Sequence, residues 1–435
     1  MNKDVIKVEA PPSKSISHRA LMCAALARGL SRLENVLESE DILRTKECLE
    51  KLGVNIKKDN GFYLVESPKE RFVFNQEVEL YGGESGTTFR LISGMLCGME
   101  GTFKFIPAGR MNKRPMNGLE QAVAPHGITF TYLQHPSCPP FILRSQGLKG
   151  GVIRVSLEQS SQYLSGLILG STLAKDKITI EIVGHKVLSW PYVGLTLQVL
   201  KEFGGKFAVE ILENGQWVAK DFQDIESVSP GKIKFHIYPG SLQARSFRVE
   251  GDFSNASYLL AAGAVGQRPV LVQGLNLQTL QGDRAILDIL EQMGARLEFQ
   301  ERGVVVFPSA LKGIELDMGK CPDLVPTVAV LASLAKGPSL IKGVAHLRLK
   351  ESDRLEAMAR ALISIGARVK VLEDGLDIEP GLTLKQPEIF HTYDDHRIAM
   401  SVSLYGLKGL KVNLDNPACV AKSFPHFFDV LRVIC

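Results

Sequence analysis

The chain has 435 residues, of which 45% are hydrophobic and 23% are charged. These proportions are typical of a soluble globular protein, and they exclude a mainly disordered, collagen-like or coiled-coil chain. Lysine and arginine exceed aspartate and glutamate by only four, 51 against 47, and no run of five like charges occurs. The charge pattern therefore does not indicate nucleic-acid binding.

The seven cysteines are odd in number and form no C-x-x-C pair. This pattern favours a reducing compartment over a disulfide framework or a structural zinc site. The N-terminus contains Asp4 and Glu9 and no long apolar core, so no secretory signal is predicted. The longest apolar stretches, such as Leu164–Ala174 and Ala256–Val265, are shorter than the ~18 residues that a membrane span needs. We therefore expect a cytoplasmic protein.

A small or polar cluster followed by an alanine- and leucine-rich segment occurs six times along the chain, at intervals of 70, 75, 94, 69 and 71 residues. Such self-similarity predicts a repeated supersecondary unit. The Ser, Asp and Gly residues at the start are typical helix N-caps, and helix N-termini can bind anions through their free N–H groups. The six segments are Pro11–Gly29, Gly82–Gly98, Glu158–Ala174, Gly251–Gly266, Cys321–Gly337 and Tyr393–Gly409, with Ser15, Ser85, Ser160, Ser254, Asp323 and Asp394 as the markers.

Between these segments, amphipathic stretches end in glycine and continue into alternating or β-branched residues, as in Arg368–Leu372. The glycine predicts a helix C-cap, and the residues after it predict a strand. Each unit is therefore expected to be strand–helix–strand–helix–strands, and the sixth copy stops at a helix within FFDVLRVIC. The glycines concerned are Gly53, Gly127, Gly204, Gly294 and Gly366.

The long interval of 94 residues contains an insertion at Asn214–Lys234, where the pairs Asn214-Gly215 and Pro230-Gly231 predict a hairpin. This insertion marks the midpoint, so we expect two α/β domains of three repeats each. A strand at Val5–Glu9 precedes the Pro11-Pro12 break, and the residues alone do not decide which half it joins.

Basic side chains recur beside the repeats, whereas the motifs G-x-x-x-x-G-K-[ST], H-E-x-x-H and G-x-S-x-G are absent. Three carboxylates, Asp323, Glu351 and Asp395, stand among these cations. A carboxylate among cations is ionised and can act as a general base, although helix caps and structural ion pairs use the same residues. The pattern predicts a small, doubly anionic substrate and proton-transfer chemistry. The basic residues are Lys14, Arg19, Arg110, Arg114, Lys350, Arg354, Arg397 and Lys422.

The spacing of Lys350 and Arg354, four residues apart, places them on one helix face if their segment is helical.

Nine motifs occur in an order that resembles the EPSP synthase (5-enolpyruvylshikimate-3-phosphate synthase) family of enolpyruvyl transferases, over essentially the whole chain. They are SKSISHRALMCAALA, SGTTFR, GRMNKRP, SSQ, QGD, PD, KESDRL, DDHR and AKSFP.

The resemblance implies two inside-out α/β domains, each of three βαβαββ repeats, with the active site in the cleft between them. With this fold we assign residues 13–247 to the N-terminal domain and residues 1–12 plus 248–435 to the C-terminal domain. The implied reaction moves the enolpyruvyl group of phosphoenolpyruvate onto the 5-hydroxyl of shikimate 3-phosphate, through a tetrahedral intermediate and without a cofactor or metal. The inhibitor glyphosate and a monomeric state are also expected.

The resemblance also implies roles for individual residues. Asp323 would take the proton of the attacking hydroxyl, and Glu351 or Lys14 would exchange a proton at the methylene carbon. Shikimate 3-phosphate would be bound by Lys14, Ser15, Arg19, Ser160, Ser161, Gln162, Ser189, Asp323, His346 and Lys350. Phosphoenolpyruvate would be bound by Lys14, Gly86, Arg114, Gln162, Arg354, Arg397 and Lys422.

Three residues depart from the family pattern. Glu84 stands where asparagine is usual, and its carboxylate is unfavourable near an anion unless it points away or pairs with a cation. His346 replaces a common asparagine, and because histidine also donates and accepts, function should survive. Leu91 replaces a common proline in what we expect to be a loop near the glyphosate site.

Two other classes of protein are alternatives to the EPSP synthase family. The sister enolpyruvyl transferase that acts on UDP-N-acetylglucosamine uses a loop cysteine and a Lys-Asn opening, whereas this chain has Ser13-Lys14-Ser15. A catalytically inactive anion-binding protein is the other, and the intact Lys14 and Asp323 argue against it.

Overall fold

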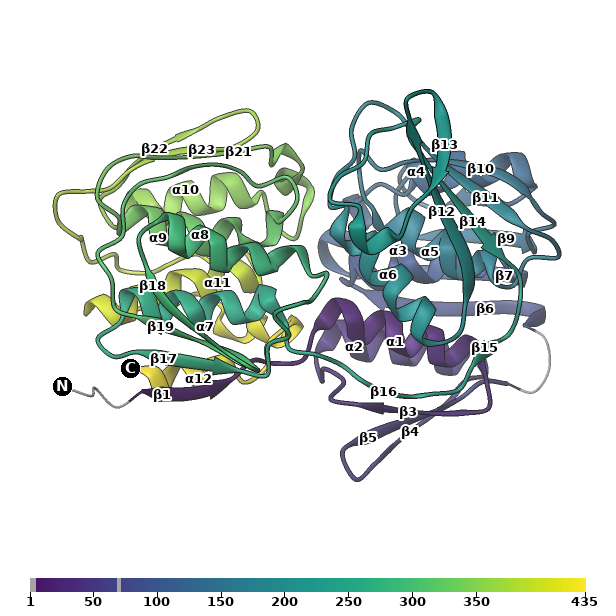
Figure 1. The fold of residues 1–435 in the computed structure, drawn as a ribbon, viewed down its shortest axis with the longest axis horizontal. Coiled ribbons are helices and arrows are strands. Elements are labelled where there is room, and N and C mark those ends of the chain that lie inside the picture. The colour runs from purple at the N-terminus through teal and green to yellow at the C-terminus, as the bar shows by residue number, and fades with distance from the viewer. Residues whose placement is uncertain (1–4, 69–71) are drawn as a thin grey trace. The chain divides into compact units, whose positions relative to one another are not determined.

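The computed structural model describes residues 5–68 and 72–435, and its contacts divide the chain into two compact units (Figure 1). One unit is Lys14–Val249, and the other is the described part of Met1–Ser13 together with Glu250–Cys435. The chain passes between them at residues 13/14 and 249/250, one or two residues from the boundaries expected at 12/13 and 247/248.

Three sheets of the Lys14–Val249 unit share one topology. In each, a parallel pair of strands forms one side of the sheet. A third strand pairs antiparallel to the inner strand of that pair, and a fourth pairs antiparallel to the third. The sheets are, in spatial order, β16 (Ser246–Arg248), β3 (Leu30–Glu34), β5 (Phe62–Glu66), β4 (Asn55–Asp59); β6 (Val73–Gly83), β7 (Glu100–Pro107), β9 (Phe141–Gln146), β8 (Thr129–Tyr132); and β10 (Gly151–Ser156), β11 (Ile178–Val183), β14 (Ile233–Tyr238), β12 (Lys206–Glu213), β13 (Gln216–Ala219).

The unit containing Glu250–Cys435 repeats this topology in two sheets. They are β1 (Ile6–Glu9), β17 (Val270–Gln273), β19 (Gly303–Phe307), β18 (Arg296–Gln300), and β20 (Glu315–Asp317), β21 (Ser339–Lys342), β23 (Leu376–Glu379), β22 (Arg368–Val371). In the sixth copy, among the described residues, only an isolated bridge joins Phe390 to Leu414, and the chain ends with α12 (Phe427–Ile434). The predicted repeat is therefore confirmed, and its last copy is reduced.

Strand pairing decides the place of the N-terminal strand and confirms the predicted hairpin. The N-terminal strand β1 pairs in parallel with β17 and so belongs to the unit of Glu250–Cys435. The insertion after Asn214 contains the predicted hairpin, since Glu213 of β12 faces Gln216 of β13 and both Asn214 and Gly215 have positive φ.

Within the Lys14–Val249 unit, the helices that open the repeats are buried and those that follow are amphipathic. Eleven of the 13 residues of α1 (Lys14–Leu26) and ten of the 11 of α3 (Gly86–Leu96) are buried, as are nine of the ten of α5 (Gln162–Ser171). By contrast, only five of the 12 residues of α2 (Glu40–Lys51) are buried. A helix that is apolar on all sides is stable only in a core, so these alanine- and glycine-rich helices lie inside the unit. The other amphipathic helices here are α4 (Asn117–Val123) and α6 (Pro191–Glu202).

Residues at the helix ends follow the predicted capping chemistry in part. Side chains of Ser85 and Asp252 accept from backbone N–H groups of α3 and of α7 (Phe253–Val265), and Asp395 does so for α11 (His396–Ser403). At the start of α5 the cap residue Ser161 makes no such bond, but Ser160 accepts from the backbone N–H of Gln162. The N-cap residue of α9 (Val325–Ser333), Leu324, makes no side-chain cap bond, so the prediction is wrong for that helix. All five predicted C-terminal glycines have positive φ, from 74° to 100°.

Helices α3 and α5 approach each other closely because glycines face each other across the contact (Figure 1). A Cβ atom added at Gly94 would lie 2.6 Å from the backbone carbon of Gly166. We expect Gly94→Ala to lower the free energy of unfolding by about 1–3 kcal/mol, because an overpacked core must shift its backbone. Urea denaturation measures this loss. Gly240→Ala is the matched control, since nothing lies within 4 Å of a Cβ there, and equal stability of both variants would contradict the close contact.

Candidate active site

In the unit of Glu250–Cys435, the carboxylate of Asp323 lies between two buried arginines. Its Oδ1 is 2.9 Å from Nη1 of Arg354, and its Oδ2 is 2.8 Å from Nη2 of Arg397. Asp323 is in the 3₁₀ turn before α9, Arg354 begins α10 (Arg354–Ser364), and Arg397 is in the first turn of α11. Three helix starts thus meet at one carboxylate, which is 20% exposed while the arginines are 2% and 5% exposed.

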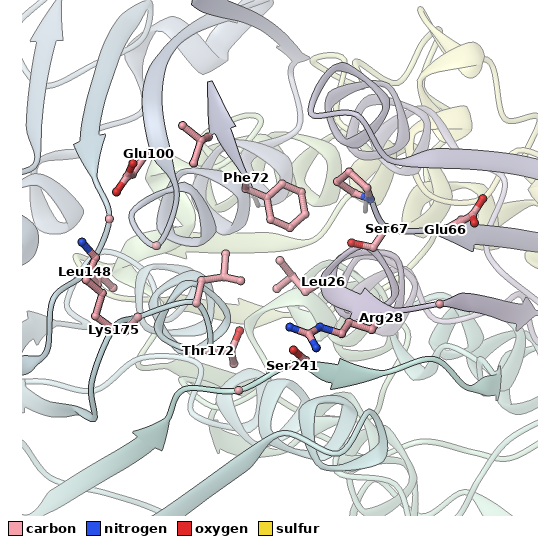
Figure 2. Close-up of a pocket in the computed structure, with 18 residues that line it drawn as sticks. Leu26, Arg28, Glu66, Ser67, Phe72, Glu100, Leu148, Thr172, Lys175 and Ser241 are labelled. Carbon is pink, nitrogen blue, oxygen red and sulfur yellow. The ribbon is translucent and has the colours of Figure 1, made fainter. Parts of the chain in front are cut away.

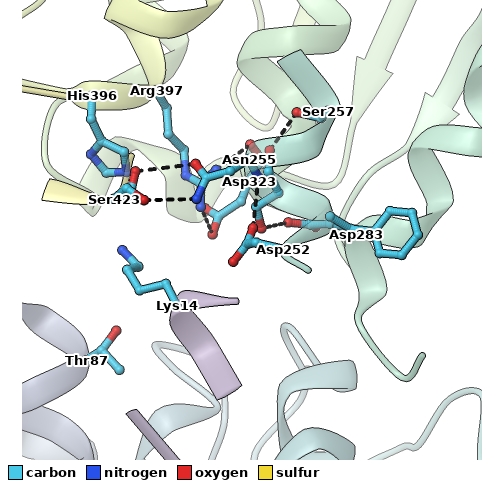
Figure 3. A network of polar contacts seen from close by, with 12 residues as sticks. Lys14, Thr87, Asp252, Asn255, Ser257, Asp283, Asp323, His396, Arg397 and Ser423 are labelled. Atoms are coloured by element: carbon cyan, nitrogen blue, oxygen red, sulfur yellow. Dashed lines mark hydrogen bonds and ion pairs between the residues drawn. The ribbon is translucent and has the colours of Figure 1, made fainter. Parts of the chain in front are cut away.

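Arg354 joins two further carboxylates to this cluster. Its Nη2 is 2.8 Å from Oε2 of Glu351, and its Nε is 2.8 Å from Oδ2 of Asp395, which is fully buried. The other oxygen of Glu351 is 3.9 Å from Nζ of Lys422. Three cations and three carboxylates therefore alternate, and Figure 3 shows the part of the cluster around Asp323 and Arg397. We call Asp323, Glu351, Arg354, Asp395, Arg397 and Lys422 the charge cluster.

The opposite charges of the cluster favour the ionised forms of Asp323 and Arg354. Burial alone would raise the pKa of Asp323, but the charges of Arg397, Lys350 and Arg354 hold that pKa well below its usual range. Burial opposes the charge on Arg354, yet Asp395, Glu351 and Asp323 raise the pKa of its guanidinium. Asp323 is therefore an ionised carboxylate, held by cations, at neutral pH.

Two predicted residues of this unit, Lys350 and His346, lie in the connection before α10. His346 is in the 3₁₀ turn Ala345–Leu349, and Lys350 ends it with an extended backbone. The segment is not helical, so the expected shared helix face of Lys350 and Arg354 is wrong. Lys350 nevertheless acts on Asp323 through its charge.

In the Lys14–Val249 unit, the first turns of α1 carry Lys14, Ser15 and Arg19. Nζ of Lys14 is 3.0 Å from Oδ2 of Asp41. Arg19 is 1% exposed and donates to Oγ1 of Thr196 at 2.7 Å and to the carbonyl oxygens of Ser15 and Tyr192. Burial lowers the pKa of Arg19 to about 10, so it remains charged at neutral pH.

Helix starts also position the next group, Gly86, Gln162 and Arg114. Gly86 begins α3, and a Cβ atom there would lie 2.6 Å from Nη1 of Arg114, so glycine is needed for the arginine to pack over the helix end. Gln162 begins α5; its Nε2 donates to Oγ1 of Thr87 at 2.9 Å, and its Oε1 accepts from Nη1 of Arg90 at 3.2 Å. Side chains of two repeats are thereby fixed to each other.

The three predicted serines of this unit lie near helix starts as well. Oγ of Ser160 accepts from the backbone N–H of Gln162 at 3.2 Å, and Ser161 is buried. Ser189 has φ of 54° just before α6. A left-handed backbone at a residue other than glycine stores strain, which is common at functional sites.

The departures Glu84 and Leu91 also have defined positions. Oε1 of Glu84 accepts from the backbone N–H of Arg110 at 3.3 Å, so this carboxylate points to the start of the 3₁₀ turn Gly109–Lys113. Leu91 is fully buried within α3. The expectation that Leu91 lies in a loop is therefore wrong.

Several polar residues beside the predicted ones were not singled out from the sequence. They are Asp41 beside Lys14, Thr87 and Arg90 beside Gln162, and Asp283 beside Ser254 in the unit of Glu250–Cys435. Arg90 lies in the motif SGTTFR and Asp283 in the motif QGD, and these motifs could have identified both residues from the sequence.

A cavity of about 740 Å³ lies at the opposite ends of the same buried helices (Figure 2). Leu26, Gly98 and Thr172, at or just beyond the C-terminal ends of α1, α3 and α5, line it together with Arg28 and Ser241. No predicted site residue lines this cavity, so it is not the candidate active site. Among the described residues, no group of three or more His, Cys, Asp or Glu side chains is arranged so that it could hold a metal ion. In the same residues no helix is long and apolar enough to cross a membrane.

The fold defines the class of protein first. The enolpyruvyl transferase NikO of Streptomyces tendae matches with a TM-score of 0.70 at 17% identity, over 99% of this chain and 94% of that chain. The EPSP synthase of Acinetobacter baumannii matches with a TM-score of 0.72 at 25% identity, over 98% of this chain and 94% of that chain. This two-domain α/β fold is therefore the fold of both proteins.

Sequence similarity then gives the family. A family model described as EPSP synthase (3-phosphoshikimate 1-carboxyvinyltransferase) matches residues 5–431. The 3-phosphoshikimate 1-carboxyvinyltransferase of Vibrio campbellii is 38% identical over 436 residues, which cover 100% of this chain and 98% of that protein. The chain belongs to the EPSP synthase family, as its motifs predicted. The family's reaction is the transfer of the enolpyruvyl group of phosphoenolpyruvate to shikimate 3-phosphate in the shikimate pathway.

Proposed function

We propose that this chain transfers the enolpyruvyl group of phosphoenolpyruvate to the 5-hydroxyl of shikimate 3-phosphate, releasing phosphate. The observation that carries the proposal is the charge cluster, in which an ionised, partly exposed carboxylate is surrounded by buried cations. This arrangement suits a substrate with about three negative charges next to a hydroxyl that must lose a proton.

Phosphoenolpyruvate is held, in this proposal, by Arg354, Arg397 and Lys422 of one unit and by Lys14, Gly86, Arg114 and Gln162 of the other. The guanidinium groups offer paired donors for phosphate and carboxylate, and their burial strengthens each contact. The N–H groups at the start of α3, where Gly86 lies, add an anion site without formal charge.

Shikimate 3-phosphate is assigned to ten residues in both units: Lys14, Ser15, Arg19, Ser160, Ser161, Gln162, Ser189, Asp323, His346 and Lys350. The hydroxyl and amide groups suit the ring hydroxyls, and the cations suit the phosphate. The guanidinium group of Arg19 donates hydrogen bonds to three oxygen atoms of the protein, which fix its orientation.

Asp323 is the general base of the addition step. In the absence of substrate, the charges of Arg397, Lys350 and Arg354 lower the pKa of Asp323 and make it a weak base. When the anionic substrate shares those cations, their effect on Asp323 decreases and its pKa rises. The carboxylate then accepts the proton of the 5-hydroxyl as the oxygen attacks C2 of phosphoenolpyruvate.

A second group must supply a proton to C3 during addition and remove one during elimination, when the C2–phosphate bond breaks. Glu351 and Lys14 remain the two candidates. Glu351 is 14% exposed and lies near Lys422, whereas Lys14 is paired with Asp41. A carboxylate close to C2 would also stabilise the positive charge that develops there.

The same proposal includes a cytoplasmic monomer that needs no cofactor and is inhibited by glyphosate, with domains at 13–247 and at 1–12 plus 248–435. Its chemistry is an addition followed by an elimination, so no net oxidation or reduction takes place. The cations of the chain stabilise the negative charges of the substrates.

Phosphate release measured with two acceptors tests the function. We expect release from phosphoenolpyruvate with shikimate 3-phosphate and none above background with UDP-N-acetylglucosamine. The reverse preference would assign the chain to the sister reaction, and no release with either acceptor would favour an inactive anion-binding protein.

A further inference from the structure

A buried carboxylic acid outside the proposed catalytic set lies close to Asp323. Asp283 is in the 3₁₀ turn Gly282–Ala285 before α8 (Ile286–Gln292), and it is 2% exposed. Its Oδ2 accepts a hydrogen bond from Oγ of Ser254 in the first turn of α7. Its Oδ1 is buried without a hydrogen-bond partner among the described residues. A buried charged oxygen with no partner costs much more free energy than a buried neutral carboxyl, so burial favours the protonated form.

Gln281, two residues before Asp283, fixes the position of this carboxyl group. Oε1 of Gln281 accepts from the backbone N–H of Phe253 at 3.0 Å, and its Nε2 donates to the carbonyl oxygen of Gly251 at 2.8 Å. The turn of Asp283 is thereby tied to the start of α7, and Asp283 cannot swing to solvent without breaking these bonds.

The titratable and charged groups that face Asp283 come from three neighbouring elements. They are Asp252 at the start of α7, Cys321 and Asp323 at the 3₁₀ turn before α9, and Arg397 of α11 (Figure 3). Burial first, and then the charge of Asp323, raise the pKa of Asp283 to about 7, against the opposing effects of Arg397 and of the Ser254 hydrogen bond. Asp252 raises this pKa further.

We infer that Asp283 is a positioning residue that is held as a neutral carboxylic acid beside the charge cluster, and that loss of its proton weakens the binding of the anionic substrate. This inference rests on the proposed function. An ionised Asp283 would add a negative charge near Arg397, where phosphoenolpyruvate is proposed to bind, and would compete with the substrate for that cation. Asp283 acts through Arg397 and Asp323 and does not itself touch the substrate.

The test compares the wild-type protein with Asp283→Asn, in which the side chain has nearly the same shape and stays neutral. At saturating shikimate 3-phosphate, kcat/KM for phosphoenolpyruvate is measured from pH 6 to 8.5. The ratio of wild type to variant cancels the titration of the substrate itself. We expect this ratio to be near unity at pH 6 and to fall by about 3- to 10-fold as the pH rises through 7. A ratio that does not change with pH would overturn the inference.

The matched control is Asp288→Asn, an exposed aspartate five residues further along. Its pH profile is expected to follow that of the wild type. Should Asp283→Asn fail to fold, Ser254→Ala gives a second test, because it removes a hydrogen bond that lowers the pKa of Asp283. The fall in kcat/KM is then expected to occur at a higher pH, and an unmoved profile would overturn the inference.

Thermal stability separates this inference from the proposed function. The pKa of Asp283 is raised above its ordinary value, so between about pH 4 and 7 the folded protein keeps this proton while the unfolded chain has lost it. The wild-type protein therefore becomes less stable as the pH rises over that range. Asp283→Asn lacks this penalty, so its Tm relative to wild type is expected to increase from pH 4.5 to pH 8. An unchanged Tm difference would overturn the inference even if the enzyme were active. A rising difference without phosphate release would retain the neutral Asp283 and reject the enzymatic function.

Discussion

Replacing Asp323 by alanine is expected to lower kcat by about 10²- to 10⁴-fold, the usual contribution of a general base. The carboxylate is the proposed acceptor of the 5-hydroxyl proton, and it is 20% exposed beside two arginines, so substrate can approach it. Without it, the hydroxyl must lose its proton to water.

The same variant is expected to keep its fold. Arg354 retains its contacts with Glu351 and Asp395, which hold the start of α10 in place. Steady-state kinetics and circular dichroism measure the two effects, with Asp288→Ala as the control on the surface of the same unit. A kcat within a few-fold of wild type in Asp323→Ala would contradict the assignment of the base.

Local chemistry explains which parts of the fold were visible in the sequence. The glycine after each amphipathic segment, the capping Ser85 and Asp252, and the Asn214-Gly215 turn each act within a few residues of the chain, so their patterns predict structure directly. The alanine- and leucine-rich segments were predicted as helices, and the structure adds that other elements cover them, as helices without a continuous polar face require.

The positions of the helix N-caps explain the two errors. Lys350 and Arg354 have helical spacing, but the helix begins at Arg354 because Asp353 caps it through the N–H of Glu356. Leu91 was expected in a loop, yet the helix capped by Ser85 continues through it. The spacing of residues in the sequence shows neither which residue begins a helix nor how deeply a side chain is buried.

The candidate site shows the same division. The motifs identified the members of the charge cluster. Apart from the local pair of Glu351 and Arg354, the ion pairs of the cluster join residues 31 to 74 positions apart, which no local pattern specifies. Asp283 was overlooked because an aspartate in a turn normally serves as a cap, and only its burial beside Asp323 distinguishes it.

The second large effect is expected for Arg354→Met, on stability. Arg354 is the common cation of Asp323, Glu351 and Asp395, and methionine fills much of its volume without its charge. Removing one partner from a buried ion cluster leaves uncompensated charges, so the free energy of unfolding should fall by about 3–5 kcal/mol at pH 7. Calorimetry measures this loss.

The pH dependence identifies the cause of that loss. In the wild-type protein, cations that include Arg354 depress the pKa of Asp323, and the resulting stability is present above the unfolded pKa, about 4, and is lost as the pH falls through the folded one. The variant lacks this contribution, so its deficit should stay at its full size from neutral pH down to about pH 4 and should shrink only as the pH falls below 4. Arg360→Met is the matched control, because Arg360 lies on the same helix, 65% exposed, and pairs only with Glu356 among the ion pairs of the described residues. Its expected loss is below about 1 kcal/mol. If both variants lost equal stability, or if the Arg354→Met deficit did not depend on pH, the cluster would not be held by the charge of Arg354.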